Sequence, residues 1–247
     1  IPYLGIALDS FGRGWALTPI PVKYTLQHFE RVSIETPKFI INSLLYAGIS
    51  VFICIIVGVP VAWVMARTKV PGRDLLDSLT TLILALPGAG IGIAYLRAFR
   101  DPLPFMNTAL IGIWIGIPIV LGVRRLPYTV RGTFSSLLIV HRSFEEAAES
   151  VGAPKMKTFK DVTFPLIWKG VLVGSLYSFI LALQEASATL LLVAPGHEMM
   201  TVGIFNFYIG GSVNEAASLG LILIIPGTVC LFVISKVAGT KMGGVFG

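Results

Sequence analysis

The stretch SFEEAAESVGAPKMKTFKDVTFP, residues 143–165, is a polar segment inside a chain that is otherwise strongly apolar. Of the 247 residues, 55% are hydrophobic and only 13% are charged, and the mean hydropathy is +0.83. In soluble domains about a quarter of the residues are charged. The composition therefore indicates an integral membrane protein, in which a polar segment of this length needs a reason of its own.

Five apolar runs surround the polar segment, and each approaches the roughly 20 residues that a membrane-spanning helix needs. They are residues 39–65, 75–99, 104–123, 170–194 and 216–237. Prolines inside several runs, and glycine pairs such as Gly170 and Gly174, indicate helices that pack against one another. We therefore expect an all-α integral membrane bundle of about five full transmembrane helices. Residues 1–38 are expected to hold the end of an earlier helix and an external segment, so the chain is expected to be part of a longer one.

The basic residues indicate how this bundle is oriented. With five crossings, thirteen of the 19 Lys and Arg residues lie on the side of residues 124–169, and six lie on the other side. The positive-inside rule places the basic side in the cytoplasm. Membrane topology then accounts for the excess of basic residues behind the net charge of +6, and no nucleic-acid partner is expected.

The polar segment contains the signals of a short helix. Ser143 followed by Glu146 has the spacing of a capping box at a helix start, and Gly152 followed by Pro154 predicts its end. Between these signals an apolar stripe at helical spacing is flanked by acids: Phe144, Ala147, Ala148 and Val151, beside Glu145, Glu146 and Glu149. A helix of about nine residues is marginal alone, so the stripe must be covered. Periodicity leaves open whether its own bundle or a soluble partner covers it.

The residues of this segment resemble a known motif. Glu146, Ala147, Ala148 and Gly152, followed after nine residues by Val162, Thr163, Phe164 and Pro165, are similar to the EAA motif of permease subunits of ABC importers. Val162 and Phe164 depart conservatively from the isoleucine and leucine of that pattern. The resemblance implies the type I (MetI-like) permease fold over residues 39–247, with residues 124–169 as a cytoplasmic loop whose short helix docks on an ATP-binding subunit. The ATPase-coupling residues that it implies are Phe144, Glu145, Glu146, Ala147, Ala148, Val151, Gly152 and Pro165.

Other stretches resemble ferric iron permeases, a group close to those for 2-aminoethylphosphonate and polyamines. They are PKFIINSLLYAG (37–48), VPGRDLLDSLTTLILALPGAGIGIAYL (70–96), RRLPYTVRGTFSSL (124–137) and EASATLLL (185–192). The resemblance implies ferric iron as cargo, with 2-aminoethylphosphonate or a polyamine as the alternative cargo. It also implies a bacterial inner-membrane protein that is the C-terminal half of a fused permease. It also implies a dimer of ABC ATP-binding subunits carrying ATP and Mg, a second permease half, an external solute-binding protein and membrane lipid as partners.

Two further places are candidates for the translocation path, because proline, glycine and polar residues interrupt apolar runs there. The first group is Pro87, Gly88 and Gly90, and the second is Gln184, Glu185 and Ser187. For the glycines, simple helix packing is the alternative explanation and the favoured one. A carboxylate in an apolar run is costly, so Glu185 either packs by hydrogen bonds or faces the path. If Glu185 titrates, the chain would instead be an ion-coupled secondary transporter.

Catalytic and metal-binding chemistry is not expected of this chain. The three histidines, His28, His141 and His197, are scattered, and Cys54 and Cys230 lie in apolar runs without ligand spacing. Since no histidine lies in a predicted span to activate a serine, an intramembrane hydrolase is disfavoured. The sequence predicts a non-enzymatic membrane subunit that holds no metal and no cofactor of its own.

Overall fold

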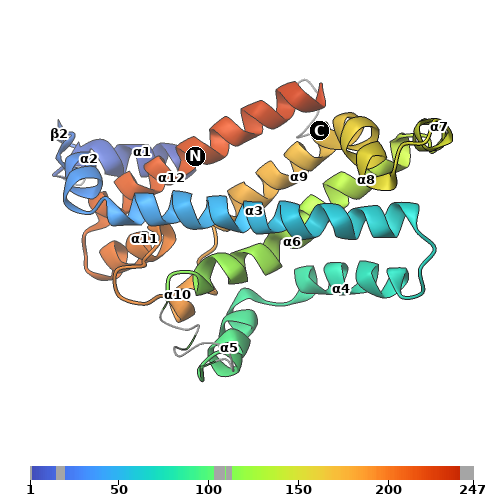
Figure 1. Cartoon of the computed structure of the whole chain (residues 1–247). Coiled ribbons are helices and arrows are strands. Elements are labelled where there is room, and N and C mark those ends of the chain that lie inside the picture. Colours follow the sequence, from blue (N-terminus) through green and yellow to red (C-terminus); the bar gives the residue numbers. More distant parts are fainter. Residues whose placement is uncertain (1, 15–19, 103–108, 110–112, 240–247) are drawn as a thin grey trace. The chain divides into compact units, whose positions relative to one another are not determined.

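The structure, a computed structural model, describes residues 2–14, 20–102, 109 and 113–239, and these are mostly helical (Figure 1). Two very short strands pair antiparallel near the beginning, with Gly12 opposite Tyr24. The elements in chain order are α1 (Pro2–Phe11), β1 (Gly12–Arg13), β2 (Lys23–Tyr24), α2 (Gln27–Glu30), the π-helical turn η1 (Arg31–Glu35), α3 (Lys38–Arg67), α4 (Arg73–Ala85), α5 (Gly88–Ala98), α6 (Gly116–Ile139), α7 (Ser143–Ser150), α8 (Lys155–Thr158), the π-helical turn η2 (Phe159–Thr163), α9 (Phe164–Leu183), α10 (Thr189–Leu192), α11 (Met200–Ile209) and α12 (Val213–Ala238).

The chain divides into two compact units, and each is described by itself. Unit 1 comprises Ile1–Gly48, Pro87–Leu121 and Ile180–Val229. Unit 2 comprises Ile49–Leu86, Gly122–Phe179 and Cys230–Gly247. The long helices α3, α6, α9 and α12 contribute residues to both units.

Three helical runs in the described residues are long and apolar enough to cross a membrane, or four if α4 and α5 count as one broken span. α3 and α12 confirm the predicted spans at 39–65 and 216–237 within a few residues. The third run is Lys155–Leu183, in which α8, η2 and α9 follow one another without a break. The all-α membrane fold is thus present, with spans that differ in detail from those predicted.

The predicted span at 170–194 is wrong at both ends. The helix already begins at Lys155, because the wider π-helical turn η2 accommodates Pro165, which has no N–H to donate to an α-helical ladder. The helix ends at Leu183. Just beyond this end, Thr189 Oγ1 and Thr201 Oγ1 each donate to the carbonyl oxygen of Glu185 at 2.8 Å, and these bonds compete with a helical backbone hydrogen bond. Glu185 therefore lies after the helix rather than within it.

The predicted span at 75–99 is interrupted. α4 ends at Ala85, Leu86 and Pro87 are extended, and α5 begins at Gly88. A residue before proline disfavours helical geometry, which explains the break. The predicted span at 104–123 falls partly on 103–108 and 110–112, outside the described residues.

The segment 124–169, predicted as a loop, is helical over most of its length. α6 continues through it to Ile139, and α7, α8, η2 and the first turn of α9 follow. A segment that connects two membrane spans can itself be helical, so the cytoplasmic coupling loop stays a prediction.

The core of unit 2 is formed where α3, α6 and α9 meet. Its buried residues are Val59, Ala62, Met65, Val130, Leu137, Ile167 and Val171. α6 and α9 approach closely through Gly132, Gly170 and Gly174: a Cβ on Gly132 would lie 2.7 Å from Gly170 O. The glycine pair at residues 170 and 174 therefore marks a helix contact, as expected from its spacing.

In unit 1, the beginnings of α3 and α12 pack against α11. Phe39 and Leu219 lie within 3.0 Å of where a Cβ on Gly203 would be placed. Asn214 Nδ2 donates to Asp9 O and Gly12 O at 2.7 and 2.9 Å, which ties the first turn of α12 to the end of α1.

Candidate coupling surface

The start of α7 differs from the predicted capping box. Arg142 already has right-handed helical dihedral angles, so Ser143 lies inside the first turn and makes no capping hydrogen bond. The Ser143 hydroxyl instead pairs with His141 Nδ1 at 2.8 Å, and the same nitrogen accepts from Ser143 N at 3.3 Å. The predicted capping box is therefore wrong, because an imidazole two residues earlier caps the free backbone donor.

The end of α7 confirms the prediction made from Gly152. Gly152 has φ = +88°, in the left-handed region that favours glycine. Its N–H donates to Glu149 O at 2.9 Å, and Ala153 N–H donates to Ala148 O at 3.1 Å. These two bonds form a Schellman motif, which stops the helix sharply and turns the chain into Pro154 and α8.

One side of α7 is fastened within unit 2 through Glu145. Glu145 Oε1 lies 3.0 Å from Arg67 Nε, and it also accepts from Thr163 Oγ1 at 3.0 Å. The side chains of Arg67 and Glu145 are only 6% and 16% exposed. Arg67 Nη2 also donates to Val140 O at 2.7 Å, and Arg142 Nη2 donates to Ala66 O at 3.0 Å. The C-terminal end of α3 is thereby joined to both ends of the link between α6 and α7.

The described residues leave most of the apolar stripe of α7 exposed. Phe144 is 55% exposed, Val151 is 87% exposed, and no residue of α7 is fully buried. Ala147 is exposed and Ala148 is half-buried, while Glu146 and Glu149 are exposed beside them. Within the described part of unit 2, the stripe is therefore not folded back against the helices beside it.

The remaining coupling candidates flank the helix. Gly152 is exposed at its end, and Pro165 is exposed in the first turn of α9. The carboxylate of Glu145, another coupling candidate, is paired with Arg67. The sequence did not identify Arg67 or His141, since neither belongs to the motif and no spacing rule relates them to it.

The candidates for the translocation path lie at the starts and ends of elements in unit 1. Pro87, Gly88 and Gly90 form the first turn of α5 and the residue before it. Gln184 and Ser187 are exposed, whereas Glu185 is only 4% exposed and accepts from Ala188 N through Oε1 at 3.1 Å.

These two groups belong to elements that touch. A Cβ on Gly92 of α5 would lie 3.3 Å from Ala188 Cα and 3.0 Å from Leu191 Cδ1. Gly92 therefore permits α5 to approach the turn before α10 closely. Ile91 and Ala188 share a small buried cluster with Val120.

In the described residues, His, Cys, Asp and Glu side chains form no group of three that would hold a metal ion. Cys54 and Cys230 are both buried, and Cys54 Sγ donates to Gly122 O at 3.2 Å. Both cysteines are thus small buried packing residues, and Cys54 also lies beside the hydroxyls of Ser178 and Thr129.

Residues 58–243 match the family described as "Binding-protein-dependent transport system inner membrane component". The chain belongs to this family. The match covers three quarters of the sequence and includes α7 with its exposed stripe. The membrane permease expected from the EAA-like residues is thus confirmed at the level of the family.

The curated relatives transport different cargoes by name. The chain is 31% identical over 226 residues to the ferric transport system permease protein FbpB of Actinobacillus pleuropneumoniae, covering 90% of this chain and 32% of that protein. It is 25% identical over 215 residues to the molybdate/tungstate transport system permease protein WtpB of Pyrococcus abyssi, covering 83% and 84%. It spans about a third of the length of the first ferric relatives.

Solved structures support the fold. An alginate-importing bacterial ABC transporter chain has a TM-score of 0.73 at 18% identity, with 95% of this chain and 89% of that chain covered. A chain of the MetNI methionine ABC transporter has a TM-score of 0.64 at 18% identity, with 83% and 95% covered. The expected permease fold is therefore confirmed.

Proposed function

We propose that this chain is the membrane-spanning permease subunit of an ATP-driven ABC importer and that α7 docks on its ATP-binding subunit in the cytoplasm. The observation that carries the proposal is the two-sided environment of α7. Its stripe is exposed at Phe144 and Val151, while Glu145 on the same helix is held to α3 by Arg67. An exposed apolar stripe on a short, anchored helix is what a helix-in-groove contact requires.

The proposed mechanism uses α7 as a rigid link. ATP and Mg act on the partner dimer of ATP-binding subunits, and this chain supplies no catalytic group. When those subunits close, α7 moves with them, and the Arg67–Glu145 pair transmits the displacement to the end of α3. The partner's nucleotide state then biases a permease that has two stable arrangements, inward-open and outward-open.

The proposed partners follow from this mechanism. A second permease half completes the path across the bacterial inner membrane, and an external solute-binding protein delivers the cargo. Gln184 and Ser187 are proposed to line the path with the Pro87–Gly90 turn, because both side chains are exposed. Glu185 is proposed to fix this turn, since its carboxylate accepts from Ala188 N.

Ferric iron is the proposed cargo. The support is the identity of 31% to the ferric transport permease over 90% of this chain. Molybdate or tungstate is the second candidate, favoured by a relative that matches over 83% of this chain and 84% of its own length. The ion-coupled secondary transporter, with Glu185 as its titrating group, is disfavoured because the family is dependent on binding proteins.

The test is uptake of labelled ferric iron by cells that lack their own system and carry the full-length permease with its partners. The wild type is compared with Glu146→Lys, which reverses an exposed charge on α7. We expect uptake by the wild type and loss of at least tenfold in the variant, with equal amounts of both proteins in the membrane. Glu149→Gln, at an exposed acid of the same helix, is expected to retain uptake.

Equal uptake by the wild type and Glu146→Lys would overturn the coupling role of α7. Absence of ferric uptake together with ATP-dependent uptake of labelled molybdate would reassign the cargo and leave the coupling role intact. Loss of pH-dependent uptake in Glu185→Gln, with uptake independent of ATP, would instead support the secondary transporter.

A further inference from the structure

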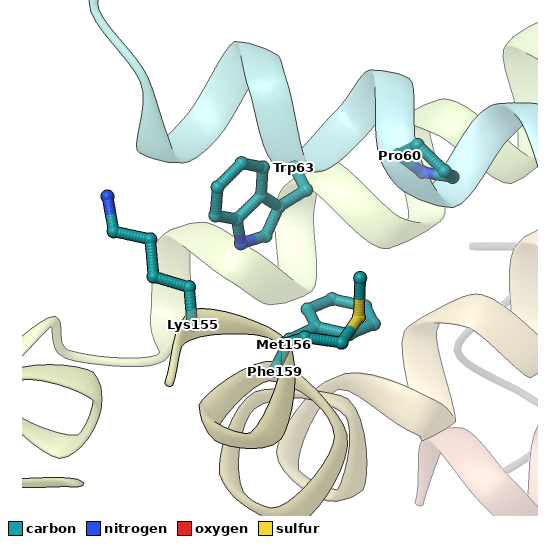
Figure 2. A pocket seen from close by; sticks show the side chains of 5 residues that line it. All are labelled: Pro60, Trp63, Lys155, Met156 and Phe159. Atoms are coloured by element: carbon teal, nitrogen blue, oxygen red, sulfur yellow. The ribbon is translucent and has the colours of Figure 1, made fainter. Parts of the chain in front are cut away.

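An apolar cavity of about 350 Å³ lies in unit 2, between α3 and the α8–η2 segment. It is lined by Pro60, Trp63, Lys155, Met156 and Phe159. In Figure 2, Pro60 and Trp63 on α3 face Met156 and Phe159, and the Lys155 amino group extends at the rim, away from the apolar side chains. The volume is at the lower end of small-molecule sites, roughly 300–1,000 Å³. We call this cavity the α3–α8 pocket.

The α3–α8 pocket continues an apolar face of a spanning helix. Phe52 and Ile56 are 64% and 55% exposed, and with Pro60 and Trp63 they follow one another at spacings of four, four and three residues. These spacings place them on one side of α3. An exposed apolar face on a membrane-spanning helix is the surface on which lipid tails pack.

The depth of the pocket fits the boundary between acyl chains and headgroups. α3 ends at Arg67, so Trp63 and Pro60 lie about 6 Å and 10 Å from that end, at 1.5 Å per residue. Tryptophan is enriched at this level of a bilayer. The pocket therefore sits where the upper part of a lipid tail lies beside its headgroup.

The charge at the rim selects the kind of lipid. Lys155 is exposed at the mouth of the pocket, and Lys157 and Lys160 are exposed nearby in the sequence. Basic pockets at the cytoplasmic end of membrane helices bind anionic headgroups. A lipid phosphate could pair with Lys155 at the rim. Because the rest of the lining is apolar, an acyl chain could pack inside the pocket.

We propose that the α3–α8 pocket binds an anionic phospholipid of the inner leaflet, with the acyl chain against Trp63 and Met156 and the phosphate beside Lys155. The leaflet rests on the orientation in the proposed function. The consequence is that the helical run from Lys155, which follows α7, is seated against lipid as well as against α3.

The test measures quenching of Trp63 fluorescence by brominated lipids in nanodiscs that contain the assembled transporter. Subtraction of the Trp63→Phe variant isolates the signal of Trp63 from the other tryptophans. Brominated phosphatidylglycerol and brominated phosphatidylcholine are compared at the same low mole fraction. We expect about fivefold stronger association of the phosphatidylglycerol, the preference that one lysine near a membrane surface supplies.

Two lysine variants make the test specific. Lys155→Gln should bring the two lipids to equal quenching, whereas Lys157→Gln, at an exposed lysine that does not line the pocket, should keep the preference. Equal quenching by both lipids in the wild type would overturn the anionic site. No quenching by either would show that water, the second permease half or the ATP-binding subunit occupies the pocket.

This result is separable from the proposed function. Nanodiscs carry the same lipids in both leaflets, so a reversed orientation would not change the quenching. Failure of the coupling role would appear in the uptake of Glu146→Lys and leave the Trp63 signal unchanged.

Discussion

Glu145 and Glu146 are neighbours in the sequence, but their environments are opposite. Glu145 is paired with Arg67 at 3.0 Å and is largely buried, whereas Glu146 is exposed on the helix surface. A buried carboxylate with a guanidinium and a hydroxyl partner fixes geometry, and an exposed one is free to meet another protein. At the scale of residues, the anchoring of α7 and its proposed docking therefore belong to different acids.

Removal of the Arg67 guanidinium should loosen α7. Arg67→Gln leaves Glu145 partly buried without its ion-pair partner, which costs about 3 kcal/mol of local stability. Hydrogen exchange of the α7 amides should become at least tenfold faster, and ATP hydrolysis by the assembled transporter should no longer drive uptake. Glu149→Gln is the matched control and should change exchange by less than twofold. Unchanged exchange in Arg67→Gln would show that the ion pair does not position α7.

Glu198, between α10 and α11, is expected to make the folding stability depend on pH. Burial raises the pKa of its carboxyl, but hydrogen bonds from the backbone at Glu198 and Gly196 and the nearby Lys38 ammonium outweigh burial and lower the pKa below its usual value. Lys38 Nζ lies 3.1 Å from Glu198 Oε2. Because the pKa is lower in the folded state, ionised Glu198 stabilises the folded protein. This stabilisation is complete above the unfolded pKa of about 4.3 and is lost as the pH falls.

Glu198→Gln should therefore flatten the acid side of the stability profile. Because Lys38 is about half-exposed, the contribution is at most about 1 kcal/mol. Thermal melting from pH 7 to pH 3 should show the wild type losing its advantage over the variant below about pH 4.5. Parallel melting profiles across this range would contradict the assignment.

At the scale of elements, the contact between α6 and α9 depends on three glycines. A Cβ on Gly174 would lie 2.7 Å from Tyr128 O and 3.0 Å from Thr129 Cα, both backbone atoms that cannot rotate away. Gly132 faces Gly174 and Gly170 in the same contact. Close approach of two helices through small residues is a stabilising arrangement in membranes.

Gly174→Ala should separate these helices. Overpacking of this kind costs typically about 1–3 kcal/mol, so the melting temperature of the detergent-solubilised protein should fall. Gly48→Ala in α3 is the control, because no atom lies within 4 Å of its added Cβ and alanine favours helix by about 1 kcal/mol. Equal melting temperatures for Gly174→Ala and Gly48→Ala would mean that α6 and α9 do not approach as described.

The elements show where sequence reasoning holds. The end of α7 was predicted because Gly152 needs only its own backbone angle, a local property. The start was missed because His141, not Ser143, supplies the cap. The start of the helical run that contains α9 was missed because a π-helical turn before Pro165 continues the helix through a residue that usually ends one.

At the scale of the whole molecule, the membrane class and the permease family followed from composition and one motif, and both are confirmed. The exposure of the α7 stripe did not follow, because periodicity describes a face without showing what covers it. The proposed path residues Pro87, Gly88, Gly90, Gln184, Glu185 and Ser187 remain predictions. Cargo is a property of the importer as a whole, and relatives of this chain are named for ferric iron, molybdate or tungstate, and sulfate.

The most direct measurement of the central claim is photo-crosslinking from α7 in the assembled transporter. A photoreactive phenylalanine analogue replaces Val151, which is 87% exposed, and in a control it replaces Phe52 on the exposed face of α3. Crosslinks to the ATP-binding subunit are expected from residue 151 and absent from residue 52. A transporter that takes up cargo like the wild type, yet gives no such crosslink from residue 151, would contradict the assignment of α7 as the coupling helix.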